Sequence, residues 1–289
     1  QSLQIISMNK YLNQGYEIWP NYFDANKIDI IKKKLDHYFK KNENLGPAVN
    51  VSILKEEELN TYGAQRDEVQ KKNKNFFIKK EDLDKGVDYY KNLTNGRSLI
   101  EPILMIEEIV ELVINDKILE FAKKNLNQEE IYIGYIKLRR FFNNKINNFD
   151  TNFFHTDDNC EKILKCIIYI DDILTINDGP FVYVSGSHIK KLDKKDGLNE
   201  YSRKDEDIEK FYGTKNIKPI YGKRGSLLFA NTLGYHKGIK PSSKDRYALY
   251  INFVCEEEYG GLGPKQKINK KILNRLKDKD KLFKFFEKI

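Results

Sequence analysis

The sequence has few cysteines and no long apolar run, and both absences limit what the protein can be. Its three cysteines, Cys160, Cys166 and Cys255, are an odd number without CxxC spacing, which fits reduced thiols better than a disulfide framework. No uninterrupted apolar segment reaches the length of a membrane span. The N-terminal residues also lack the basic and then apolar pattern of a signal peptide. We therefore expect a cytoplasmic protein that does not bind membranes.

Arginine is scarce among the basic residues, although the net charge is +8. The chain has 51 lysines and arginines, but arginine occupies only eight of these positions, and the lysines are spread along the whole sequence. The arginine guanidinium can donate two parallel hydrogen bonds to a phosphate or a base edge, which the lysine ammonium does less well, so this distribution argues against a nucleic-acid surface. An anionic small substrate is as compatible with the charge.

The first part of the chain, residues 1–130, is predicted to be mainly helical. Asp24 is a plausible N-cap for a helix in which apolar residues recur at helical spacing, and two more helices are predicted over 101–115 and 116–126. Residues 44–98 are polar and irregular, and a loop of this length is either functional or poorly ordered. Because no linker or internal repeat divides the sequence, residues 1–289 are predicted to form a single domain.

A change of hydrophobic period at residue 131 predicts a β core over residues 131–256. The β-rich segments, several of them bounded by turn residues, are 131–142, 152–157, 164–170, 181–184, 225–230 and 247–254. Residues 186–218 form a charged excursion, and residues 257–289 are predicted to form an amphipathic C-terminal helix. The pattern indicates an α+β fold with a mainly β core, a jelly-roll or cupin-like barrel with flanking N-terminal and C-terminal helices.

Two residues at the end of an aromatic β segment, His155 and Asp157, carry the main chemical signal. Residues two apart in a strand point to the same face, so both side chains can reach one point, and His236 from a distant segment can join them. Two histidines and one carboxylate form a facial triad with open coordination positions, the ligand set typical of non-haem Fe(II) oxygenases. Arg246 opens another strand. Its neighbour Asp245 should point to the opposite face, so we expect a bound carboxylate as the partner of Arg246.

In combination, these motifs resemble the phytanoyl-CoA dioxygenase family of Fe(II)/2-oxoglutarate-dependent oxygenases. The resemblance spans about residues 131–256, and its pieces are 155–157, 178–181, 186–188, 225–229, 232–238 and Arg246. It implies a double-stranded β-helix with Fe(II) bound by His155, Asp157 and His236, and with residues 44–98 as substrate-side loops. It also implies that 2-oxoglutarate and O2 take the open positions, that Arg246 binds the distal carboxylate, and that Thr232 assists there or behind the metal ligands. Because the carboxylate ligand is retained, the resemblance favours hydroxylation, with release of succinate and CO2, over halogenation.

Other polar residues in the β segments are weaker candidates. Lys137 and Arg139 share one face of their strand, so either can touch 2-oxoglutarate or an anionic substrate, and Tyr169 can donate a hydrogen bond to the cosubstrate or simply pack. His188 is interpreted as structural or pocket-lining, and His37 as a surface residue of the first helix.

The leading interpretation is thus an Fe(II)- and 2-oxoglutarate-dependent dioxygenase that hydroxylates a small molecule. One alternative is a 2-oxoglutarate oxygenase that acts on a nucleic acid or another macromolecule, which would show steep salt dependence of binding. A second alternative is a non-catalytic, cupin-like binding protein, which would be favoured if His155, Asp157 and His236 did not converge. The sequence indicates neither the substrate nor the oligomeric state.

Overall fold

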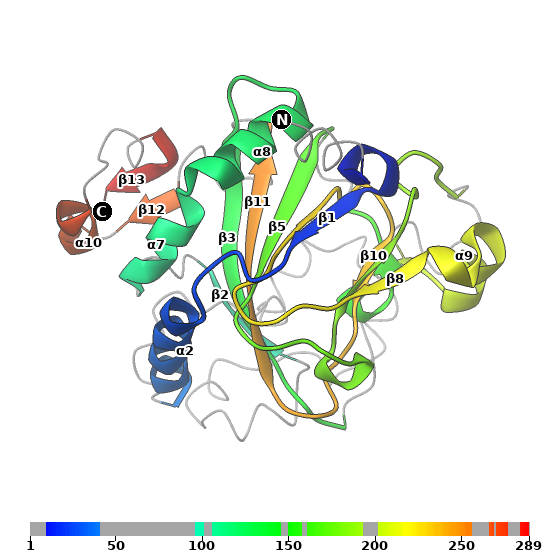
Figure 1. Cartoon of the computed structure of the whole chain (residues 1–289), viewed down its shortest axis with the longest axis horizontal. Helices are drawn as coiled ribbons and strands as arrows, with labels where there is room; N and C mark the ends of the chain where they lie inside the picture. The colour runs from blue at the N-terminus through cyan, green and yellow to red at the C-terminus, as the bar shows by residue number, and fades with distance from the viewer. Residues whose placement is uncertain are drawn as a thin grey trace, which may run out of the picture.

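Two antiparallel sheets face each other in a computed structural model of the chain, and helices line the outside of the larger sheet (Figure 1). The structure describes residues 10–40, 96–100, 106–145, 150–157, 161–192, 202–255, 266–268, 270–276 and 284–288. Most of the region interpreted as substrate-side loops, together with Cys160, lies outside these residues.

The larger sheet has six strands, and its two faces serve different purposes. In spatial order the strands are β1 (Tyr16–Trp19), β9 (Leu227–Ala230), β5 (Ile163–Tyr169), β11 (Arg246–Val254), β3 (Tyr132–Phe141) and β2 (Gly96–Ile100). Successive side chains of a strand point to opposite faces. Accordingly, Leu249, Ile251 and Phe253 of β11 pack with the helices, whereas Ala248 packs between the sheets.

The smaller sheet closes the other side of the barrel. Its order is β7 (Ser202–Arg203), β4 (Phe154–His155), β10 (His236–Gly238), β6 (Phe181–Val184) and β8 (Ile217–Ile220). Between the two sheets lies an inner apolar core that includes Ile167, Tyr169, Phe181, Tyr183 and Leu228. Two such facing sheets form the predicted jelly roll.

Three helices cover the outer face of the larger sheet, namely α2 (Ala25–Lys40), α7 (Glu107–Val113) and α8 (Asp116–Leu126). Asp24 caps α2 as predicted, because its Oδ1 accepts hydrogen bonds from the backbone N–H groups of Asn26 at 2.8 Å and Lys27 at 3.2 Å. On the buried side of α8, Phe121 stacks on Phe229 of β9 with the ring centroids 4.0 Å apart. The helices therefore hold the sheet from outside and leave its inner face to the barrel.

The N-terminal part is less helical than predicted. β1 pairs with β9 at the edge of the larger sheet, and β2 occupies residues 96–100, partly within the region interpreted as irregular loops. Both are short segments at the two edges of the sheet, where pairing with a neighbouring strand, and not local sequence preference, determines the conformation.

Two further expectations were wrong in detail. The charged segment 186–218 is not wholly an excursion from the β core: it contains helix α9 (Asp205–Tyr212) and β7, and it ends within β8, and β7 and β8 are the two edge strands of the smaller sheet. The C-terminal segment is not one amphipathic helix. Its described residues form β12 (Gln266–Ile268), the short helix α10 (Lys270–Arg275) and β13 (Phe286–Lys288), and the two strands pair in parallel. Buried Phe285 and Phe286 fit this packing as well as they fit a helical stripe, so the hydrophobic pattern could not distinguish the two.

In the part of the chain that the structure describes, no helix is both long and apolar enough to cross a membrane.

Candidate metal centre

His155, Asp157 and His236 converge between the two sheets. His155 of β4 and His236 of β10 are directly paired residues of antiparallel strands, with ring centroids 4.3 Å apart. Asp157 follows β4, and its backbone N–H donates to the carbonyl oxygen of Thr232 at 2.8 Å. One ligand atom from each of the three residues lies within 4.8 Å of the others. The side chains that the sequence predicts as one group are therefore one group in space.

Backbone carbonyls orient both imidazoles. Nδ1 of His155 lies 2.9 Å from the carbonyl oxygen of Phe153, and Nδ1 of His236 lies 3.0 Å from that of Gly234. Because a carbonyl oxygen only accepts, each Nδ1 carries the proton and each Nε2 keeps its lone pair. His236 Nε2 is buried and makes no hydrogen bond. A buried lone pair without a donor is expensive, and a metal ion would satisfy it.

The charges at the centre suit a divalent cation. Burial opposes ionisation of Asp157, but the ammonium group of Lys165 holds the pKa of this carboxyl well below its usual range. Lys165 Nζ lies 2.5 Å from Asp157 Oδ2, and Lys165 is itself only 7% exposed. Burial also lowers the pKa of His236, so its ring is neutral. An ionised carboxylate at Asp157 and a neutral imidazole at His236 are the protonation states that metal binding requires of these two groups.

A tight turn before β10 places His236. A Cβ added to Gly234 would lie 2.1 Å from the hydroxyl oxygen of Tyr183, so only glycine fits there. The same hydroxyl donates to the carbonyl of Asn231 at 2.7 Å, and the next residue, Tyr235, donates its N–H to Ser187 Oγ at 2.7 Å. The turn is thereby fixed to β6 and to the segment after it.

Arg246 is a buried cation without an acidic partner among the described residues. It is 4% exposed, its guanidinium carbon lies 3.9 Å from the ring centroid of Phe141, and its Nε makes no hydrogen bond. Asp245 does face away, as predicted. It accepts hydrogen bonds from Arg140 Nη2 and from the backbone N–H of Asn143, both at 2.9 Å. A buried guanidinium of this kind favours an anionic ligand.

The weaker candidates occupy different parts of the barrel. Lys137 and Arg139 share the inner face of β3, because they pair with Tyr250 and Ala248 of β11. Arg139 donates to Thr151 Oγ1 at 3.4 Å and also lies over Phe141, with its guanidinium carbon 4.8 Å from the ring centroid.

Tyr169 and Thr232 lie at opposite ends of the inner face. The Tyr169 hydroxyl donates to the carbonyl of Ile220 at 2.8 Å, and Tyr169 pairs with Ala248, two residues from Arg246. Thr232 lies beside Asp157 through the backbone hydrogen bond described above. Its fully buried hydroxyl has no hydrogen-bond partner. The structure thus places Tyr169 toward Arg246, and Thr232 toward the metal centre.

The remaining histidines do not belong to the group. His188 Nε2 lies 2.9 Å from the carbonyl of Leu12, which fits the structural interpretation, and His37 is exposed on α2.

Sequence reasoning missed Lys165 and Asn252. Each is a single polar residue inside an apolar β segment, and a lone polar residue in a fully buried strand marks an inward-facing group that needs a partner. That signal could have found both.

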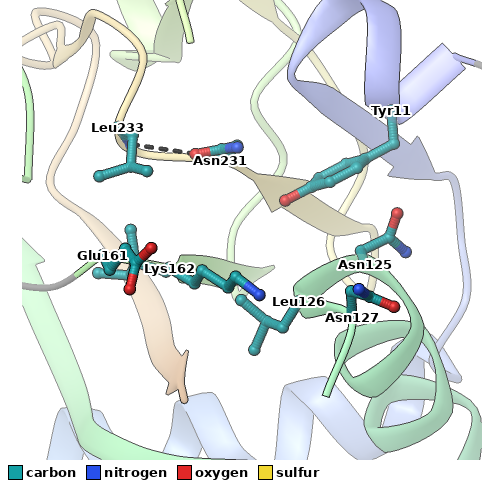
Figure 2. Close-up of a pocket in the computed structure, with 9 residues that line it drawn as sticks. Tyr11, Asn125, Leu126, Asn127, Glu161, Lys162, Asn231 and Leu233 are labelled. Carbon is teal, nitrogen blue, oxygen red and sulfur yellow. Dashed lines mark hydrogen bonds between the residues drawn. The ribbon is translucent and has the colours of Figure 1, made fainter. Parts of the chain in front are cut away.

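A separate pocket of 330 Å³ lies between the end of α8 and the start of β5 (Figure 2). Tyr11 and Lys162 point into it, and Asn231 accepts a hydrogen bond from the backbone N–H of Leu233 on its far side. Its lining includes none of the three residues of the metal centre.

The chain resembles known proteins in its three-dimensional structure and not in its sequence. No protein-family model matches the sequence, and no curated protein matches it. Among solved structures, HygX from Streptomyces hygroscopicus with nickel and 2-oxoglutarate bound has a TM-score of 0.57 at 12% identity, over 91% of this chain and 89% of that one. This chain has the jelly-roll fold of that protein.

Two other similar structures agree. The epimerase SnoN in complex with Fe3+, alpha ketoglutarate and nogalamycin RO has a TM-score of 0.56 at 13% identity, over 88% of this chain and 84% of that one. EctD from S. alaskensis with bound Fe has a TM-score of 0.56 at 15% identity, over 88% and 76%. The predicted fold class is therefore confirmed, and at these identities the likeness concerns the fold.

Proposed function

We propose that the protein is an Fe(II)- and 2-oxoglutarate-dependent oxygenase that acts on a small molecule. The observation that carries the proposal is the convergence of His155, Asp157 and His236 with their ligand atoms within 4.8 Å, in a barrel that also buries Arg246 without an acidic partner among the described residues. The fold is shared with proteins whose structures hold iron or nickel together with 2-oxoglutarate.

The residues present fit both groups. Nε2 of His155, Nε2 of His236 and a carboxylate oxygen of Asp157 would hold Fe(II), with open positions on the metal. Arg246 would bind the distal carboxylate of 2-oxoglutarate through its guanidinium fork. When bound, the iron and cosubstrate supply the oxidation of a substrate C–H bond with release of succinate and CO2.

The chain's own residues then have three tasks. The carbonyls of Phe153 and Gly234 hold the two imidazoles with their Nε2 atoms toward one point. Lys165 keeps Asp157 ionised. Phe181 stacks on His236 with ring centroids 5.4 Å apart and shields that imidazole from water.

We further propose membership of the phytanoyl-CoA dioxygenase family and hydroxylation as the outcome, because the motif order resembles that family and Asp157 is retained. The solved structures with a similar fold include an epimerase and a carbocyclase, so the type of oxidation that this chain performs is to be determined by product analysis. Lys137, Arg139, Tyr169 and Thr232 are proposed as secondary contacts to the cosubstrate or substrate.

The deciding experiment is an anaerobic titration of the metal-free protein with Fe(II) and 2-oxoglutarate, followed by visible absorption. A charge-transfer band that needs both components supports the proposal. If the folded protein gives no band, the proposal is wrong, and the non-catalytic binding protein becomes the better interpretation.

A further inference from the structure

The inner barrel has a polar cluster at the end opposite to Arg246. On β11, Asn252 pairs with Lys165 of β5, so the two side chains lie next to each other on the inner face. Lys165 contacts Asp157, and the backbone N–H of Asp157 in turn donates a hydrogen bond to the carbonyl oxygen of Thr232. Lys165, Asn252 and Thr232 thus form one continuous group, here called the far-side cluster.

Two members of the far-side cluster lack partners. Asn252 is fully buried, and among the described residues neither its amide nitrogen nor its amide oxygen finds a hydrogen-bond partner. The Thr232 hydroxyl is also fully buried and unpartnered. An unsatisfied buried polar group destabilises a protein, because it has lost its hydrogen bonds to water without replacement. Two such groups beside one metal centre indicate that something polar binds between them.

The order of residues along the barrel separates this cluster from the proposed cosubstrate position. Arg246 lies at the Tyr169 end of the larger sheet, six residues along β11 from Asn252. Between them is the metal centre, where Phe181 stacks on His236 while Asp157 contacts Lys165. A cosubstrate that runs from the metal toward Arg246 extends away from Asn252. The far-side cluster therefore lies on the side of the metal centre away from the proposed cosubstrate.

The chemistry of the cluster favours a carboxylate. The Lys165 ammonium, the Asn252 amide and the Thr232 hydroxyl all donate hydrogen bonds, and one of them is charged. A divalent cation bound to Asp157 would add positive charge next to the ammonium and so favour a further anion. Asn252 Oδ1 can accept from Lys165 or from a donor on the same ligand.

We propose that Lys165, Asn252 and Thr232 form a binding subsite for a carboxylate group of the substrate. The inference rests on the proposed function and adds a chemical class to it: the substrate is a small carboxylic acid, held on the side of the metal opposite to 2-oxoglutarate.

The test uses simple carboxylates on the full chain loaded with Ni(II) and 2-oxoglutarate. Acetate and butyrate are titrated at constant ionic strength, with acetamide and butyramide as neutral counterparts, and the thermal midpoint is followed. We expect the carboxylates to stabilise the wild-type protein and the amides to have no effect.

Asn252→Leu and the isosteric Thr232→Val should each weaken carboxylate binding by about tenfold. Asn125→Leu is the matched control, because Asn125 also has a buried unpartnered amide oxygen but lines the separate pocket of Figure 2.

Three results would overturn the inference. If carboxylates bound no better than amides, the far-side cluster would not be a carboxylate site, and water would satisfy its polar groups. Carboxylates that bind wild-type and variant proteins equally would place the anion elsewhere. A parallel loss of 2-oxoglutarate affinity in Asn252→Leu and Thr232→Val would assign the cluster to the cosubstrate. The Fe(II) and 2-oxoglutarate band separates these results from failure of the proposed function. Its presence in all variants with lost carboxylate binding supports the inference, and its absence in wild-type protein overturns both.

Discussion

His155 and His236 face each other across one residue pair of the smaller sheet, although 81 positions of sequence separate their numbers. Pairing of β4 with β10 brings their ring centroids to 4.3 Å, and a carbonyl two residues before each histidine holds its Nδ1. Both histidines are thus oriented in the same way, by a hydrogen bond from Nδ1 to the carbonyl oxygen two residues earlier. Since Asp157 lies two residues after His155, one strand pair assembles all three residues of the candidate metal centre.

Asp157→Ala should abolish metal binding more completely than it disturbs the fold. The substitution removes the anionic ligand, and Fe(II) affinity should fall by more than about 100-fold, above the loss caused by removing a supporting contact. Isothermal titration with Fe(II) under anaerobic conditions measures this affinity. Asp172→Asn is the control, because Asp172 pairs with Arg224 away from the metal centre. Wild-type turnover in Asp157→Ala would disprove the metal assignment.

Arg246→Leu should affect the cosubstrate and leave the metal unchanged. Loss of the guanidinium removes a charge-assisted pair, so the 2-oxoglutarate concentration at half-saturation of the visible band should rise at least about tenfold. Arg140→Leu is a matched control, because Arg140 lies on the neighbouring strand but faces outward to Asp245. Equal 2-oxoglutarate affinities in Arg246→Leu and wild-type protein would mean that Arg246 does not bind the cosubstrate.

The sequence allowed the β core and the pairing of His155 with Asp157 to be predicted because both depend on short-range patterns, whereas His236 was joined to them by the motif order of the family resemblance. Short apolar strands bounded by turn residues, such as Phe181–Val184, and the two-residue spacing of His155 and Asp157 are visible without tertiary information. The edge strands were not predictable. β1 and β8 form through pairing with β9 and β6, which are remote in sequence.

The residues that contact the candidate metal centre could not be predicted from the sequence either. Lys165 contacts Asp157 only because β5 passes behind the metal centre, and Asn252 lies next to Lys165 only through the register of β11. Sequence spacing carries no information about register between strands. A polar residue within an apolar run could be noted from the sequence, but its partner could not be named.

Lys165→Met should destabilise the metal-free protein and increase the stabilisation by metal. Without the ammonium group, the buried Asp157 carboxylate loses its nearest cation, and the free energy of unfolding should fall by about 2 kcal/mol, less than for a fully buried pair. Ni(II) replaces the missing charge, so the rise in thermal midpoint on Ni(II) addition should exceed that of wild-type protein. Lys32→Met is a control, because its ion pair with Asp171 lies on the outer, helix-covered side. An equal rise in Lys165→Met and wild-type protein would contradict this charge balance.

Asp178 should contribute stability that disappears in acid. Slight burial opposes its ionisation, but hydrogen bonds from Ser243 and from the backbone of Thr175 and Leu174 lower the pKa of Asp178 to about 2. A carboxyl with a depressed folded-state pKa stabilises the protein above its unfolded pKa of about 3.9, and this contribution is lost as pH falls toward 2. Asp178→Asn should therefore lower the thermal midpoint at pH 7, and the difference from wild type should shrink below pH 4. A difference that is constant from pH 7 to pH 3 would show that ionisation of Asp178 is irrelevant.

Gly234→Ala should disturb the metal centre through Tyr183. The added Cβ would lie 2.1 Å from the Tyr183 hydroxyl oxygen and 2.8 Å from Ser187 Oγ, so the turn before β10 must shift and His236 with it. Overpacking of this kind costs about 1–3 kcal/mol, and Ni(II) affinity should fall because Nε2 of His236 moves. Tyr183→Phe alone removes the hydrogen bond to Asn231 and should cost about 1 kcal/mol. In the double variant the missing hydroxyl relieves part of the clash, so stability and Ni(II) affinity should be higher than the two single effects predict. Strictly additive losses in this double-mutant cycle would show that the contact with Tyr183 does not position the turn.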